Sequence, residues 1–132
     1  MIEQSLEQFL SEDTGLGSLI DGRVFPMVIP QGSGKIPCVV YTLVGTSGRT
    51  ANLCGQTDTK VRGAFQIDSY SKRYATTKAI AKAVKDLMCG FVGDMAGTRV
   101  SLITLETDAD IGDPDPGLYR VSQQYFIWYV EK

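Results

Sequence analysis

The sequence predicts a single α+β domain over residues 1–132, in which a mainly antiparallel sheet of four to five strands packs against helices on one face. Three observations lead to this fold class. A chain of 132 residues has the ordinary size of one domain. Two segments repeat apolar residues at helical spacing, and several others alternate apolar with polar residues, as strands with one buried face do. The expected order of elements is α-β-β-β-α-β-β.

Residues 2–12 are expected to form the first helix, because apolar side chains recur at i, i+4, i+7 and i+8. Gly15 and Gly17 then indicate a turn. Residues 23–30 predict a short strand. Pro26 indicates that this strand lies at the edge of the sheet, because proline cannot donate a ladder hydrogen bond.

Two further strands are expected in the next part of the chain. Residues 38–45 are rich in β-branched and aromatic side chains, which favour a strand. Residues 46–58 hold few large apolar groups and predict a long polar loop. Residues 59–70 alternate strictly, so that one set of side chains faces the core. That set is Val61, Gly63, Phe65 and Ile67.

A second helix is expected over residues 72–89, with Ser71 as its N-cap and Gly90 just beyond its end. Its lysines and Arg73 are expected on the solvated side. The apolar stripe that would cover the sheet consists of Ile80, Val84, Leu87 and Met88.

The C-terminal third predicts two more strands, over residues 98–106 and 118–130, joined by an acidic turn over residues 107–117. The last strand has apolar side chains on both faces near its end. A small domain that shows apolar groups on both faces of one strand needs a second partner for them, either within the domain or outside it.

Composition excludes several classes of chemistry. The chain has no histidine, which is the commonest general base and metal ligand. Its three cysteines form no CxxC pair, so they predict free thiols in a reducing compartment. The net charge of −2 favours neither nucleic acid nor an anionic membrane. Neither a signal peptide nor a membrane-spanning segment is expected.

Each catalytic or binding motif fails on its own spacing. Gly34-Lys35 resembles a phosphate loop, but Ile29 and Ile36 stand where that motif needs Gly and Ser or Thr. Ser69 and Lys72 match S-x-x-K without its partner motifs. The aspartates of the acidic turn do not follow the spacing of an EF-hand. We therefore expect a protein that is not an enzyme, with no catalytic, cofactor-binding or metal-binding residues.

Three groups of residues, in order and in register, resemble a family of small tail-completion proteins. The family occurs in long-tailed bacteriophages, prophages and gene-transfer agents, and the resemblance covers roughly residues 16–130. The first group is Arg23–Pro26, Pro30–Gly32, Pro37 and Val40-Tyr41; the second is Phe65–Tyr70 with Ala75, Ala79 and Ala83-Val84; the third is Asp115–Ser122 with Phe126–Trp128.

The resemblance implies a structural role in virion assembly. Family members resemble tail terminators, which form a ring, hexameric in relatives, that caps the head-proximal end of the tail tube. Such a ring stops tube polymerisation and joins the tail to the head. The implied partners are other copies of the chain, the major tail tube protein and a head connector or stopper protein. DNA would pass only transiently and without specificity, no membrane would be involved, and no cofactor is implied. The implied location is the head–tail junction of the virion, after assembly in the bacterial host cytoplasm.

A ring subunit needs two unlike side surfaces as well as a top and a bottom. The candidate interface residues are Phe25, Pro26, Arg49, Leu53, Phe126, Trp128 and Tyr129. A candidate acidic loop facing the lumen consists of Asp108, Asp110, Asp113 and Asp115, whose charge would keep passing DNA from adhering. Two alternatives stay open: a head-closure or stopper component of the same junction, and a small ligand-binding α+β domain.

Overall fold

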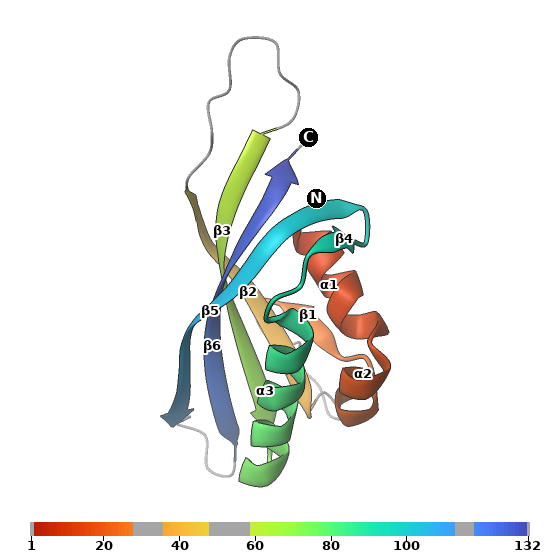
Figure 1. The fold of residues 1–132 in the computed structure, drawn as a ribbon. Coiled ribbons are helices and arrows are strands. Elements are labelled where there is room, and N and C mark those ends of the chain that lie inside the picture. The colour runs from red at the N-terminus through yellow and green to blue at the C-terminus, as the bar shows by residue number, and fades with distance from the viewer. Residues whose placement is uncertain (1, 28–35, 48–58, 113–117, 132) are drawn as a thin grey trace.

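The computed structural model describes residues 2–27, 36–47, 59–112 and 118–131 (Figure 1). These residues form three helices and six strands. The helices are α1 (Ile2–Glu12), α2 (Thr14–Ile20) and α3 (Tyr74–Met88). The strands are β1 (Val24–Pro26), β2 (Cys38–Ser47), β3 (Thr59–Ser71), β4 (Gly93–Met95), β5 (Thr98–Gly112) and β6 (Tyr119–Glu131).

The strands form one sheet in the order β1-β2-β3-β6-β5-β4. Every neighbouring pair is antiparallel except β1 and β2, which run parallel. The three helices lie along one face of this curled sheet, and none of the described helices covers the opposite face (Figure 1). The predicted α+β class is confirmed, but the predicted strand number and element order are wrong, because α2 and β4 were not expected.

The turn predicted at Gly15 and Gly17 is wrong, because both glycines lie inside α2. Asp13 caps this helix, and its Oδ2 atom accepts a hydrogen bond from the backbone N–H of Leu16 across 2.8 Å. Leu16 and Ile20 are fully buried, one turn apart. The cap and the two buried side chains outweigh the poor helix propensity of the two glycines.

Strand β4 pairs with the start of β5 through a tight hairpin. Ala96 and Gly97 at its tip both have positive φ, of 46° and 97°. Positive φ at both central residues is typical of the two-residue turns that match strand twist. The sequence did not predict β4, because only Met95 of its three residues is buried and such a short strand shows no alternation of apolar and polar residues.

The core lies between the helices and the covered face of the sheet. The predicted alternation in β3 is confirmed, since Val61, Gly63, Phe65 and Ile67 are all buried. Strand β6 continues this face with Val121, Gln123, Tyr125, Ile127 and Tyr129, all of which are buried. From α3, the predicted residues Ile80, Val84 and Met88 pack here, while Leu87 is half-buried at the margin.

The ends of α3 differ slightly from the prediction. The helix begins at Tyr74 with Arg73 as its N-cap, so Ser71 is not the cap. The Oγ atom of Ser71 instead accepts a hydrogen bond from the backbone N–H of Arg73 across 3.2 Å. Gly90 has a φ of +76° directly after the C-cap Cys89, which confirms its predicted place beyond the helix.

Helix α1 contacts both edge strands of the sheet, β1 and β4. The hydroxyl groups of Ser5 and Thr98 share a buried hydrogen bond of 2.6 Å. On the other side of the helix, the Tyr41 hydroxyl donates to Glu7 Oε2 across 3.1 Å. The first helix thus joins the two edges of the curled sheet. In the part of the chain that the structure describes, none of the helices is long and apolar enough to cross a membrane.

Candidate assembly surfaces

The uncovered face of the sheet carries a cluster of aromatic and aliphatic side chains, which we call the open-face cluster. Its members are Arg62, Leu102, Phe126 and Trp128. The rings of Phe126 and Trp128 meet edge to face, with centroids 6.1 Å apart and an interplanar angle of 82°. Arg62 lies 4.5 Å above the centre of the Phe126 ring. Both rings are only half-buried, so this patch offers apolar surface to a partner.

The candidate interface residues do not all meet at this cluster. Phe126 and Trp128 lie in it, but Tyr129 points to the covered face, where it is only 3% exposed. Phe25 and Pro26 lie on β1 at the far edge of the sheet. The predicted edge position of Pro26 is therefore confirmed. Arg49 and Leu53 lie outside the described residues.

At the other end of the same face, Asp68 and Arg120 form a shielded ion pair. Arg120 Nη2 donates to Asp68 Oδ2 across 3.0 Å, and the Asp68 side chain is only 7% exposed. Gln66 Nε2 lies 3.2 Å from both carboxylate oxygens. The Arg120 guanidinium also lies 5.7 Å from the centre of the Tyr70 ring. The charges of Asp68 and Arg120 are neutralised by each other, which points to a structural role for this pair.

The predicted acidic turn is partly wrong, because Asp108 and Asp110 lie on β5, which runs on to Gly112. Asp113 and Asp115 lie outside the described residues. Asp110 accepts hydrogen bonds from the Tyr74 hydroxyl at 2.6 Å and from Lys78 Nζ at 2.7 Å. These bonds hold the pKa of Asp110 below its ordinary value and raise the pKa values of Lys78 and Tyr74. The charge of Asp110 is therefore matched by a cation on α3.

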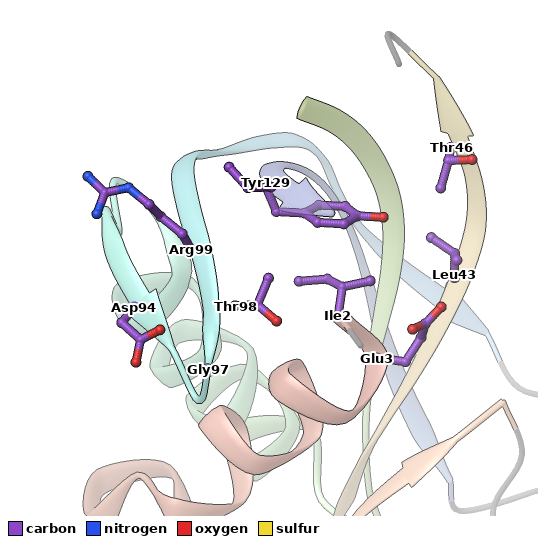
Figure 2. Close-up of a pocket in the computed structure, with 10 residues that line it drawn as sticks. Ile2, Glu3, Leu43, Thr46, Asp94, Gly97, Thr98, Arg99 and Tyr129 are labelled. Carbon is purple, nitrogen blue, oxygen red and sulfur yellow. The ribbon is translucent and has the colours of Figure 1, made fainter. Parts of the chain in front are cut away.

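A pocket of about 600 Å³ opens where the start of α1 meets one end of the sheet (Figure 2). Figure 2 shows Ile2, Thr98 and Tyr129 around its centre, with Leu43 and Glu3 on the β2 side. Asp94 and Arg99 come from the β4–β5 hairpin. Its walls mix apolar groups with charges of both signs. Across residues 2–27, 36–47, 59–112 and 118–131, no group of three or more Cys, Asp or Glu side chains could hold a metal ion.

Sequence reasoning missed this pocket, because α1, β2, β6 and the β4–β5 hairpin approach one another only in the fold. One local signal was available. A small residue followed by glycine, Ala96-Gly97, stands between Met95 and the alternating residues of β5, as in a tight hairpin. It would have brought Thr98 and Arg99 next to β4.

Comparisons with known proteins agree with this fold. A chain from the structure titled "Virion of native gene transfer agent (GTA) particle" superposes with a TM-score of 0.74 at 17% sequence identity. The match covers 98% of this chain and 95% of that chain. Among curated proteins, none matches. The family model described as "Tail completion protein gp17" matches residues 4–130, which is nearly the whole chain. The chain therefore belongs to the tail completion protein gp17 family.

Proposed function

We propose that this protein is a structural component of a phage-type tail, and that it acts there as the terminator. Copies of the chain form a ring, hexameric as in relatives, on the head-proximal end of the tail tube. The ring stops addition of the major tail tube protein and presents a surface to the head connector or stopper. Its place is the head–tail junction of the virion, and DNA passes through it without specific binding.

Family membership over residues 4–130 is the observation that carries this proposal. The fold supports it, because a covered face and an open face give one small subunit two different surfaces. The open-face cluster offers half-buried aromatic groups, which are common at protein–protein contacts. A role built on shape and contact also agrees with a sequence that matches no complete catalytic motif.

Deletion of the gene from its phage or prophage tests the proposal. We expect tails of uncontrolled length that do not join heads, measured by electron microscopy of lysates. Restoring the gene should restore the length. If the deletion strain makes tails of normal length that contain the major tail tube protein but lack heads, the terminator role is contradicted. That outcome, with the protein recovered on isolated heads, would favour the head-closure or stopper alternative.

The lumen-facing role of Asp108, Asp110, Asp113 and Asp115 stays a prediction. Asp110 is paired with Lys78, and Asp108 lies beside Lys78, Lys82 and Lys85, so cations on α3 partly offset both described aspartates. Replacing all four residues with Asn should slow or reduce DNA ejection if their charge keeps DNA from adhering. Unchanged ejection and assembly would remove the basis of this idea.

A further inference from the structure

Charge is strongly segregated between two helical regions of this chain. Residues 1–22 contain five acidic residues and no Lys or Arg, whereas residues 72–85 contain five basic residues and no Asp or Glu. The acidic set is Glu3, Glu7, Glu12, Asp13 and Asp21. The basic set is Lys72, Arg73, Lys78, Lys82 and Lys85. A chain with a net charge of only −2 thus carries two opposite local fields.

These charges lie toward opposite sides of the subunit. Glu3 and Glu7, one turn apart on α1, face β2: Glu7 accepts from Tyr41, and Glu3 lines the pocket beside Leu43. Both carboxylates contribute, after burial, to raising the pKa of Tyr41 to about 12. We call this flank of α1 the acidic flank. Figure 1 shows α1 on the side of the molecule away from the far end of β5.

The basic flank consists of Lys78, Lys82 and Lys85, which recur at i, i+4 and i+7 on α3 and lie beside Asp108 of β5. They surround a hollow of about 170 Å³ with Ala81, Asp108 and Gln123. Lys78 is paired with Asp110, but Lys82 and Lys85 are exposed and make neither a hydrogen bond nor an ion pair to any residue that the structure describes. Asp108 offsets one of these two charges, and Lys72 and Arg73 add two more at the start of the helix.

The hollow also contains an unused hydrogen-bonding atom. Gln123 is only 1% exposed, and its Nε2 atom donates to the Ala81 carbonyl across 3.1 Å. Its Oε1 atom is buried and has no hydrogen-bond partner in the described structure. A buried amide oxygen without a donor is costly, so the site favours a partner that brings one. On α1 the exposed Gln4 follows Glu3 in the sequence and carries such a donor.

We infer that the basic flank of one copy binds the acidic flank of α1 of the next copy, head to tail. Glu3 and Glu7 of one copy would pair with Lys82 and Lys85 of its neighbour. Because the two flanks are unlike and lie toward opposite sides, repeating the contact produces a ring or a filament, not a closed two-fold dimer. The inference rests on the proposed function for its self-association and names the surfaces that perform it.

Zero-length carbodiimide cross-linking tests this contact, because it joins carboxylates to amines that touch. An equal mixture of ¹⁴N-labelled and ¹⁵N-labelled full-length chains is cross-linked and mapped by mass spectrometry. We expect mixed-isotope links between Glu3 or Glu7 and Lys82 or Lys85, with yields that fall as salt is raised. Links within single chains only, or mixed links that avoid these residues, would overturn the inference.

Charge reversal supplies the matched control. Lys82→Glu with Lys85→Glu, and separately Glu3→Lys with Glu7→Lys, should each reduce mixed-link formation about tenfold or more. Mixing the two reversed variants should restore it, because each then offers the flank that the other needs. If the Glu7 variant melts early, Glu3→Lys with Gln4→Lys replaces it, since Gln4 is exposed. Failure of the mixture to recover would count against the contact.

Two other outcomes separate this inference from neighbouring ideas. If Lys82→Glu with Lys85→Glu abolishes binding of the protein to double-stranded DNA but leaves the cross-links unchanged, the inferred contact is overturned. The basic flank is then assigned to DNA binding. Tail length is measured independently in the deletion experiment. If the expected cross-links are missing but deletion of the gene abolishes control of tail length, the contact alone is refuted. If the cross-links form but deletion of the gene leaves tail length normal, the terminator role alone is refuted.

Discussion

Arg120 Nη2 donates a hydrogen bond to Asp68 Oδ2 across 3.0 Å, between residues 52 positions apart in the sequence. The two side chains are diagonal neighbours across β3 and β6, since Tyr70 pairs with Arg120 and Asp68 with Ser122. Asp68 is buried and the Arg120 side chain is three-quarters covered. The pair therefore links the two central strands on the uncovered face of the sheet.

Arg120→Leu should lower the free energy of unfolding by about 3 kcal/mol, because it leaves a buried carboxylate with only Gln66 as a described side-chain donor. Urea denaturation followed by tryptophan fluorescence measures this change. Asp21→Asn is the matched control, because Asp21 is 90% exposed and its ion pair with Arg23 spans 3.5 Å. We expect its effect to stay within about 0.5 kcal/mol. Equal effects would show that burial of the pair does not matter.

Gly63→Ala should destabilise the fold by about 1–3 kcal/mol through overpacking. An added Cβ would lie 3.2 Å from ring atoms of both Phe65 and Tyr129, and both rings are buried. Gly45→Ala is the control, since its Cβ would meet nothing within 4 Å. Thermal melts of the two variants should differ clearly. A neutral Gly63 variant would show that the two rings can shift.

The Asp110 pair predicts a specific pH dependence. Because the folded pKa of Asp110 is lowered, its ionised form stabilises the fold above the ordinary aspartate value, and that contribution is lost as pH falls below about 4. Because the folded pKa of Lys78 is raised, its contribution is lost as pH rises above about 10. The difference in melting temperature between wild type and Asp110→Asn should therefore be greatest near neutral pH and shrink toward both extremes. Asp86→Asn, a substitution of an exposed aspartate on α3 that changes the charge equally, is the control.

The cysteines should differ in reactivity. Burial raises the pKa of the Cys38 thiol to about 11, and this side chain is fully covered, whereas Cys89 is exposed. At pH 8, iodoacetamide should modify Cys89 faster than Cys38 by roughly two orders of magnitude or more. Site-resolved mass spectrometry measures both rates in one sample, and denaturant should make them similar. Rapid native labelling of Cys38 would mean that its segment opens readily.

Trp128→Ala should weaken association with a partner more than it weakens the fold, because Trp128 is half-buried on the uncovered face. Ile67→Asp is the contrasting change, since Ile67 is fully buried and a charge there has no partner in the core. We expect the second variant to be unfolded by circular dichroism and the first to be folded but poor in tail assembly. Similar thermal losses with intact assembly would place Trp128 in the core instead.

Long elements with regular burial could be predicted from the sequence. In β3, every second residue from Val61 to Ile67 is buried. In α3, burial recurs at every third to fourth residue. These patterns alone identify the two elements. Short elements could not. Strand β4 has a single buried residue, and α2 contains two glycines, so packing and capping had to outweigh local propensity.

The prediction of an acidic turn was partly wrong for a different reason. Asp108 and Asp110 have low strand propensity, but β5 continues because β6 pairs with it through Gln123 and Val121. The partner of Asp110, Lys78, is 32 residues away and leaves no local trace in the sequence. The open-face aromatic pair was predictable because Phe126 and Trp128 alternate within one strand, whereas the Asp68–Arg120 pair needed the register of two strands.

The hydrogen bond between Ser5 and Thr98 sets an order of events during synthesis. The two residues are 93 positions apart, so this contact of α1 forms only after the β4–β5 hairpin has been made, whereas the contacts of α1 with α2, β1 and Tyr41 involve earlier segments. Until then the apolar stripe of α1, which includes Leu6 and Leu10, has only part of its native cover. The packing of α1 against the β4–β5 hairpin depends on contacts between distant parts of the chain, and such contacts are typical of slow folding. Helix α1 thus gains its complete set of contacts only once the β4–β5 hairpin is present, although Tyr41 of β2 can hold the acidic flank earlier.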